Sequence, residues 1–428
     1  MSKRNENRPG YKKTKVGWIP EDWECLTIKE VCSQPVSGFS AKGNAEAVSP
    51  NDSNIGVLRL SCIIEGYFNS YENKKVVQAD IPKVKTPISK DTMLISRSNT
   101  EELVGVVCYV EKDYPNLFLS DLIWQVSAKS SEILSIRWLT NLLLTKEYRR
   151  KIAARANGTS GSMKKITKGG FLTLPIPLPP LPEQKKIAEI LSAWDRSIEQ
   201  VGKLIDAKQR LKKGLMQQLL TGWLRFPEFN HETHERHEKD KGELPVGWRK
   251  LKLGEICNPQ QWPTIPTKSF LDSGYPVYGA NGIIGYYHTY NHEQETIAVT
   301  CRGATCGEVN LAPEKSYITG NAMSLDDIND KEVNQMFLFY ILKHRGFRDI
   351  ISGSAQPQII RNNIAKIRIT LPVLPEQTRI AAVLSTCDKE IELLKKKQEK
   401  LKEQKKGLMQ KLLTGEVRHP EFLKEGHS

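Results

Sequence analysis

The chain contains two copies of one long segment. Residues 178–229 and 371–422 align without a gap at an offset of 193, and 28 of the 52 aligned residues are identical. A shorter likeness links 17–32 to 242–257 at an offset of 225, so the first intervening segment is 32 residues longer than the second. This period is too long for a solenoid, whose repeats have roughly 20–45 residues. The sequence therefore predicts a duplicated half, in the order globular domain, helix, globular domain, helix.

Each copy is predicted to form one long helix. Each copy starts with a proline-rich lead, and proline is tolerated in the first turn of a helix but not in its interior. Glu183 and Glu376 stand near the predicted starts, where the helix dipole favours negative charge. Gly222 and Gly415 follow the sequence LLT and are typical helix stops. From Glu183 to Leu220 the helix would have 38 residues and a length of about 57 Å.

A narrow apolar seam follows both helices. Alternating steps of four and three residues give ten seam positions per copy, of which eight are apolar. Such a seam is typical of a coiled coil. The simplest arrangement is an antiparallel pair of these two helices, with the globular domains at opposite ends, in which Ile187 meets the Leu412 layer and Leu219 meets the Ile380 layer. The alternative is that each helix packs separately on another subunit. The main seam residues are Ile187, Leu191, Trp194, Ile198, Leu215 and Leu219 in the first helix, and Ile380, Leu384, Ile391, Leu394, Leu408 and Leu412 in the second.

Both globular halves begin with short strand-like runs and end with a helical stretch. The strand-like runs of the first half are 56–64, 92–98, 104–110 and 122–128, and its helical stretch is 133–156. Those of the second half are 276–279, 283–290, 296–303 and 316–325, and its helical stretch is 333–351. This order favours α+β domains.

The chain divides into six predicted segments. They are a first globular domain (1–177), a first spacer helix (178–222), a polar linker (223–243), a second globular domain (244–370), a second spacer helix (371–416) and a tail (417–428). The linker contains His231, His234 and His237, but their spacing departs from HExxH, so we expect a solvated linker and no metal site there.

Composition and absent motifs narrow the function. No apolar run approaches the roughly 20 residues that span a bilayer, and the eight cysteines form no CxxC pair, which favours reduced thiols in the cytoplasm. The net charge of +14 suits phosphate contact, although such an excess also serves solubility. The chain has no Walker A loop, methyltransferase motif, nuclease motif or nucleophile elbow. We therefore expect a binding subunit without catalytic residues or a cofactor of its own.

The chain resembles the specificity subunits of Type I restriction–modification systems. The resemblance is carried by the duplicated LPPLPEQ and LPVLPEQ segments, the duplicated KKGLMQ and LLTG helix ends, and the similar starts at Trp23 and Trp248. Residues 94–105 with 156–166 resemble one type of target-recognition domain. Residues 276–287 with 301–309 and 353–359 resemble another.

The resemblance implies a pseudo-two-fold, duplicated chain that binds double-stranded DNA. Each target-recognition domain would bind one half of a split site, and the antiparallel helices would set the gap and dock two modification subunits. Those subunits would bring S-adenosylmethionine and methylate adenine. Two restriction subunits would bring ATP, Mg²⁺ and cleavage. Inserting four residues after Val201 should then lengthen the gap and leave both half-sites unchanged.

Base contacts are expected from polar loops, because Arg suits guanine and Asn or Gln suits adenine in the major groove. The candidates are Arg97, Asn99, Lys164 and Lys165 in the first domain, and Arg302, Gln356, Gln358, Arg361 and Asn362 in the second. The alternative for Arg97 or Arg302 is that it caps a strand or pairs with a carboxylate. Two other functions stay open: a self-sufficient DNA-modifying enzyme with divergent motifs, and a coiled-coil scaffold without a nucleic-acid role.

Overall fold

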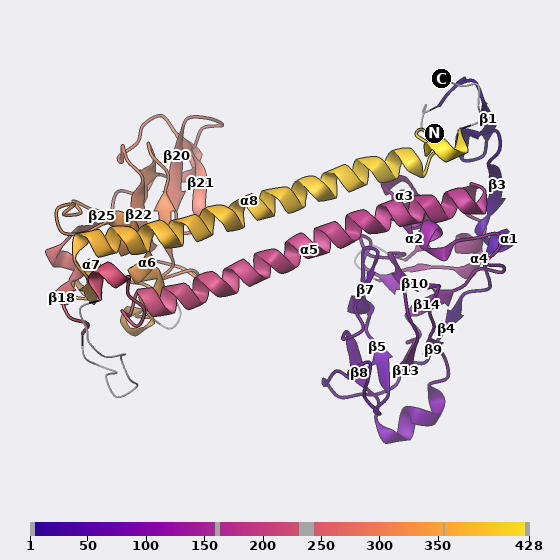
Figure 1. Ribbon diagram of the computed structural model, residues 1–428, viewed down its shortest axis with the longest axis horizontal. Coiled ribbons are helices and arrows are strands. Elements are labelled where there is room, and N and C mark those ends of the chain that lie inside the picture. The colour runs from indigo at the N-terminus through magenta and orange to yellow at the C-terminus, as the bar shows by residue number, and fades with distance from the viewer. Residues whose placement is uncertain (1–4, 159–162, 231–243, 354–355, 424–428) are drawn as a thin grey trace. The chain divides into compact units, whose positions relative to one another are not determined.

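The chain forms two compact units in a computed structural model. The residues that the structure describes are 5–158, 163–230, 244–353 and 356–423. Unit 1 is formed by 1–200 with 398–428, and unit 2 by 201–397. Each unit holds one α+β domain and part of both long helices, α5 (Leu181–Leu219) and α8 (Leu374–Leu412) (Figure 1). Among the described helices, none is long and apolar enough to cross a membrane.

The domain of unit 1 is built on an antiparallel sheet of order β12-β10-β14-β4. Helices α2 and α3 complete its main core, in which Met93, Trp124 and Trp138 are at most 1% exposed. A second sheet, of order β8-β5-β13-β9, contributes to two smaller cores. The bounds are β4 Val36–Ser37, β5 Gly56–Leu58, β8 Asn73–Lys75, β9 Pro87–Ile88, β10 Thr92–Ser96, β12 Val107–Val110, β13 Tyr114–Phe118, β14 Ile123–Val126, α2 Ile136–Leu144 and α3 Lys146–Ala153.

The predicted helical stretch 133–156 forms two helices rather than one. The chain is extended at Thr145, with ψ at 147°, and the Thr145 side chain accepts a hydrogen bond from the backbone N–H of Tyr148. A threonine that caps its own downstream helix competes with the continuous helix, because its hydroxyl replaces a backbone carbonyl as acceptor. The apolar pattern extends across this break, so the pattern alone does not reveal it.

The domain of unit 2 repeats this architecture. Its antiparallel sheet has the order β19-β25-β22-β23, and α6 covers it over a core in which Ile297, Met323 and Phe337 are fully buried. A smaller sheet has the order β21-β20-β24. The bounds are β19 Asn258–Gln260, β20 Tyr275–Gly279, β21 Gly282–Tyr287, β22 Thr296–Thr300, β23 Val309–Ala312, β24 Tyr317–Ile318, β25 Ala322–Asp326 and α6 Gln335–Arg345.

The two domains share one topology. The main sheets correspond strand for strand, and β5 pairs in parallel with β13 as β20 does with β24. The main difference lies between β5 and β8, where residues 59–72 include a β6–β7 hairpin (Ile63–Ile64 and Tyr67–Phe68). The matching connection in unit 2, from β20 to β21, has only residues 280–281. This connection therefore accounts for 12 of the 32 additional residues of the first domain.

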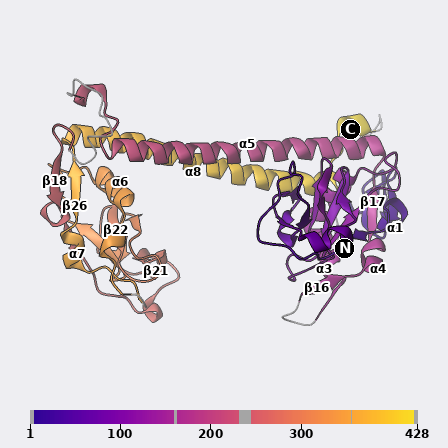
Figure 2. The same ribbon diagram turned by 90° about the horizontal axis from the view of Figure 1, so that it is seen from below.

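The long helices pair antiparallel within each unit (Figure 2). In unit 1 Ile187 and Leu412 belong to one core, and in unit 2 Leu219 and Ile380 belong to another, as the hypothesised register requires. None of the twenty seam positions is exposed. The polar side chains of the seam interact with the facing helix. Lys212 forms an ion pair with Asp388, Lys405 with Asp195 and Lys208 with Glu390, and the Gln398 side chain donates a hydrogen bond to the Ile198 carbonyl. The repeat offset of 193 relates Lys212 to Lys405 and Asp195 to Asp388, so the first two ion pairs are equivalent. The helix pairing therefore follows the sequence repeat.

The glutamine of each LPEQ motif attaches its long helix to the adjacent domain. The Gln184 side chain accepts a hydrogen bond from the N–H of Ser135 at 2.9 Å and donates to the carbonyls of Ile133 and Pro179. Gln377 makes the same three bonds, with the N–H of Asn334 and the carbonyls of Glu332 and Pro372. Both glutamines are completely buried. These bonds explain why an amide occupies this position in both copies.

The glutamate of each LPEQ motif binds an arginine that follows the other helix. Arg418, beyond α8, donates two hydrogen bonds to Glu183 of α5 in unit 1. Arg225, beyond α5, donates two to Glu376 of α8 in unit 2, at 2.9 and 2.8 Å. Glu183 also accepts the indole N–H of Trp23 at 3.0 Å. Each ion pair therefore fixes the end of one helix to the start of the other.

The glycine of each LLTG sequence allows this close packing. Gly222 and Gly415 have φ of 71° and 68°, which a residue with a side chain adopts at a cost. A Cβ atom at Gly222 would lie 2.4 Å from Pro245, and one at Gly415 would lie 2.7 Å from Pro20. The segments around Trp23 and Trp248, which the repeat also links, therefore supply the surfaces on which the helix ends rest.

Candidate nucleic-acid interface

One small sheet in unit 1 brings together the four candidates of the first domain. It has the order β11-β16-β15, with bounds β11 Ser98–Asn99, β15 Ala156–Asn157 and β16 Lys164–Ile166. Asn99 lies opposite Lys164, and Ser98 lies opposite Lys165. Arg97 directly precedes β11, so residues from two distant parts of the chain meet at one place.

Three of these four side chains already have partners within the domain. The Arg97 guanidinium donates to the Asp121 carbonyl at 3.3 Å and lies 5.9 Å from the Trp124 ring centroid. Asn99 donates to the Ser96 hydroxyl at 3.1 Å, and the Lys164 ammonium donates to the Gly158 carbonyl at 3.0 Å. Lys165 is exposed and forms no hydrogen bond or ion pair with another described side chain. Lys165 is therefore the candidate in this domain whose charge is free for a ligand.

The second domain has the same arrangement in shorter form. Gln358 lies opposite both Arg302 and Ser352, as Lys165 lies opposite Ser98 and Asn157. Lys165 and Gln358 are 193 residues apart, and the buried Ile166 and Ile359 that follow them donate to the carbonyls of Arg97 and Cys301, at 3.1 and 3.0 Å. The structural correspondence between the two copies therefore begins by residue 165, earlier than the sequence repeat, which begins at residue 178.

The two candidate arginines occupy different positions in this common arrangement. Arg302 corresponds to the buried Ser98, and Arg97 corresponds to Cys301, whose thiol donates to the Gly320 carbonyl. Neighbouring residues of an extended chain point to opposite faces. Arg302 is exposed and makes no hydrogen bond or ion pair within the described residues, whereas Arg97 is half-buried and engaged. Residue type alone does not distinguish these two environments.

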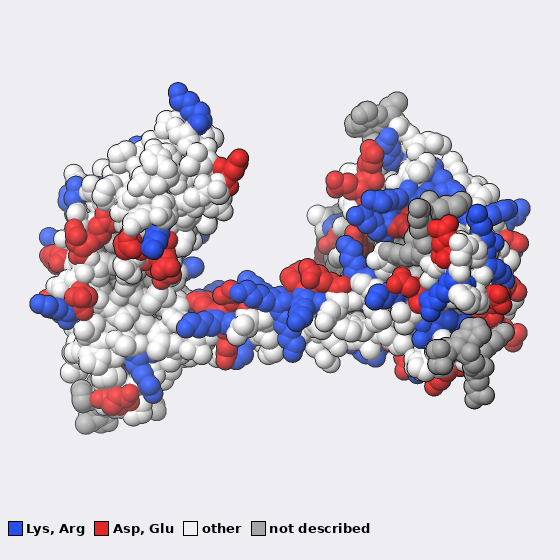
Figure 3. Space-filling view, turned by 90° about the horizontal axis from the view of Figure 1, so that it is seen from above, with Lys and Arg blue, Asp and Glu red and all other residues white. Residues whose placement is uncertain are grey.

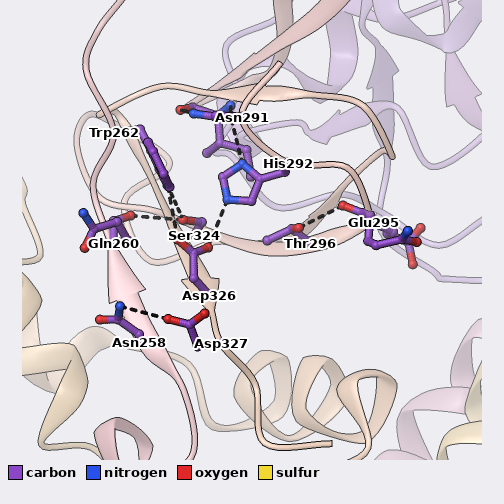
Figure 4. A network of polar contacts seen from close by, with 12 residues as sticks. Asn258, Gln260, Trp262, Asn291, His292, Glu295, Thr296, Ser324, Asp326 and Asp327 are labelled. Atoms are coloured by element: carbon purple, nitrogen blue, oxygen red, sulfur yellow. Dashed lines mark hydrogen bonds and ion pairs between the residues drawn. The ribbon is translucent and has the colours of Figure 1, made fainter. Parts of the chain in front are cut away.

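The remaining candidates lie near Gln358. Gln356 and Gln358 are exposed, and Arg361 and Asn362 begin the short helix α7 (Arg361–Ala365). The Arg361 guanidinium donates to the Asn258 side-chain oxygen at 2.6 Å. Asn258 in turn donates to Asp327 at 3.2 Å (Figure 4). Arg361 is therefore held in place by the side chain of Asn258, on strand β19.

A polar network that the sequence does not reveal supports this side of the second domain (Figure 4). Asp326 accepts from the His292 ring at 3.0 Å and from the Trp262 indole at 3.3 Å, and the Trp262 indole also donates to Ser324 at 3.0 Å. The adjacent Gln261 donates to the Gly320 carbonyl and to Cys301, the residue before Arg302. The network therefore fixes the backbone on which Arg302 stands. These residues come from strand β25 and from separate loops, with no shared motif.

The described side chains include no cluster of three or more His, Cys, Asp or Glu that could hold a metal ion, and the linker histidines lie outside the described residues. Burial raises the pKa of the Cys32 and Cys257 thiols to about 12, so neither is a thiolate at neutral pH. Figure 3 shows many Lys and Arg side chains on one face of unit 1, and a largely uncharged surface on unit 2.

Comparisons with known proteins agree with this arrangement. A family model described as the Type I restriction modification DNA specificity domain matches residues 20–209 and 245–403. A relative described as the MjaX specificity subunit, from Methanocaldococcus jannaschii, is 30% identical and covers 95% of this chain and 96% of its own length. The MjaVIII specificity subunit of the same organism is 26% identical, with 94% of each chain covered.

A solved structure shares the fold. The S subunit of a Type I restriction–modification system from M. genitalium has a TM-score of 0.61 and 19% identity, and the match covers 95% of this chain and 98% of that one. The duplicated family match accounts for both recognition domains and most of both helices. The chain therefore belongs to the family of Type I restriction–modification DNA specificity subunits.

Proposed function

We propose that each domain binds one half of a bipartite site in double-stranded DNA, and that the helix pair sets the gap between the halves. The observation that carries this proposal is a pair of domains with one fold and unlike residues at equivalent positions. Lys165 corresponds to Gln358, and the buried Ser98 corresponds to the exposed Arg302. Different side chains on one scaffold suit two different half-sites, because side chains that reach base edges specify sequence.

The antiparallel helices support an inverted arrangement of the half-sites. Two similar domains related by an approximate two-fold axis would face the duplex in opposite orientations, as the halves of dimeric DNA-binding proteins do. The same duplication offers two similar surfaces to two modification subunits. Those subunits would supply S-adenosylmethionine and methylate adenine, and two restriction subunits would supply ATP-dependent, Mg²⁺-dependent cleavage.

A reconstitution experiment tests this proposal. The chain alone, the modification subunits alone and the assembled complex are each incubated with duplex DNA and labelled S-adenosylmethionine. We expect methyl transfer at a defined bipartite sequence only with the assembled complex, because the chain would supply recognition and its partners the chemistry. Transfer by the chain alone would support a self-sufficient enzyme. A complex that transfers methyl groups irrespective of sequence would support a scaffold and contradict the proposal.

A further inference from the structure

We propose that the tip of the β20–β21 hairpin, residues 280–284, determines specificity in the second half-site by contacting base edges beside Arg302. This inference rests on the proposed function, because it takes DNA as the ligand of unit 2. It adds a recognition element whose residues were outside the predicted set.

The hairpin tip is attached to the loop that carries Arg302. The Thr300 hydroxyl donates to the Ala280 carbonyl at 3.0 Å. The Thr305 hydroxyl lies 3.3 Å from the same carbonyl and 3.1 Å from the Asn281 side-chain oxygen. Thr300 and Thr305 stand on either side of Arg302 in the chain. The tip and Arg302 are therefore held as one structural element.

The tip exposes apolar side chains that the fold does not use. Ile283 is 51% exposed and Ile284 is 42% exposed, on a strand at the edge of its sheet. Asn281 beside them is exposed as well. An exposed apolar edge strand favours aggregation, so proteins usually charge or cover it. This one carries no charge, because no Asp, Glu, Lys or Arg occurs from 273 to 292.

The surroundings of the tip favour DNA as the ligand. Arg302 and its neighbour Gln358 present a guanidinium and an amide without partners among the described residues, and both groups suit base edges. The major groove admits a two-stranded β ribbon, and apolar side chains contact the thymine methyl group there. The hairpin itself contributes no carboxylate that would repel phosphates. Asn281 and Ile283 are therefore better suited to contact base edges on the groove floor than to contact the phosphate backbone.

The test uses full-length variants assembled with their modification subunits. Asn281→Ala and Ile283→Ser should each weaken discrimination at one or more positions of a single half-site by about tenfold, and leave the other half-site unchanged. Thr305→Val should act in the same direction because it releases the tip, and Thr305→Ser should keep the native specificity. The measurement is the methylation rate on a library of duplexes with single substitutions in each half-site.

Leu271→Ser is the matched control. Leu271 is 49% exposed and pairs with Tyr286 near the base of the same hairpin, away from its tip. We expect this variant to keep native discrimination. Native discrimination by both Asn281→Ala and Ile283→Ser would overturn the inference while the bipartite site of the native complex still stands. Weaker binding of modification subunits at unchanged discrimination would also overturn it, and would identify the tip as a protein contact. If the native complex recognises no bipartite site, the proposed function fails, and this inference with it.

Discussion

At the scale of single residues, the most informative side chains of this protein are the identical ones that the repeat places in both copies. Gln184 and Gln377 are polar, buried and fully bonded, in surroundings where an unpaired group is costly. Their identity was visible in the sequence, but their role was not, because two of the three partners of each glutamine lie 43–51 residues earlier in the chain. By contrast, the residues proposed to contact DNA differ between the copies, so the repeat does not point to them.

Replacing Gln377 should destabilise unit 2. Gln377→Ala leaves the Asn334 N–H and the carbonyls of Glu332 and Pro372 without this partner. Each buried group left unpaired costs roughly 1–3 kcal/mol. We expect a clear fall in the free energy of unfolding measured with urea. Gln209→Ala, at an exposed position of α5, is the control and should change it little. Equal stability of the two variants would contradict this role of Gln377.

The candidate arginines show what residue-level prediction misses. Arg97 and Arg302 were selected by one argument, but the structure places them one position apart in the common arrangement. The position of each arginine depends on the strand register, which is set by the pairing of Ser98 with Lys165 and of Arg302 with Gln358. That pairing joins segments more than 50 residues apart, so no local pattern specifies it.

At the scale of elements, the two long helices were the most predictable part of the protein. Their extents were predicted from the prolines at the helix starts, the glycine after each helix end and the apolar seam, because the signals that start and end a helix are local in sequence. The strand-like runs 92–98, 104–110 and 122–128 also contain β10, β12 and β14. The break at Thr145 and the β6–β7 insertion were not predicted, because they depend on capping and tertiary packing rather than on periodicity.

The ion pair between Arg225 and Glu376 should contribute strongly to holding the helix ends in unit 2. Its side chains are only 5% and 1% exposed. Arg225→Ala should cost about 3–5 kcal/mol, because it leaves a buried carboxylate without its partner. The exposed pair of Arg249 and Glu332 is the matched control. Arg249→Ala should cost about 1 kcal/mol or less.

A double variant separates the charge from the packing of this buried pair. Arg225→Met with Glu376→Leu removes both charges together and should recover much of the stability lost in Arg225→Ala. The measurement is the free energy of unfolding in urea for all variants. If Arg225→Ala is no less stable than Arg249→Ala, the buried pair does not fix the helix ends.

At the scale of the whole molecule, the sequence repeat accounts for more than similarity between halves. The arginine that follows each helix binds the glutamate that starts the other, so both copies are needed to complete each helix junction. The duplication, the α+β class and the antiparallel pairing were all predicted from the repeat and its seam. The reciprocal junctions were not, because identity between copies does not show which copy a residue contacts.

In the proposed function, the helix pair sets the distance between two independently recognised half-sites. Four residues inserted after Val201, and four more after Gln398 on the facing part of α8, would lengthen the pair by about 6 Å. That length corresponds to about two base pairs at 3.4 Å each. The matched insertion in α8 keeps the pairing on both sides of the added turn.

Sequencing of methylated adenines in cells that carry the native or the lengthened chain, with its modification subunits, shows whether the gap follows the length of the helix pair. The native chain should give two unlike half-sites at a fixed gap. The lengthened chain should give the same two half-sites with about two more unspecified base pairs between them. A change in the identity of the recognised bases at an unchanged gap, or an uninterrupted site, would contradict the account.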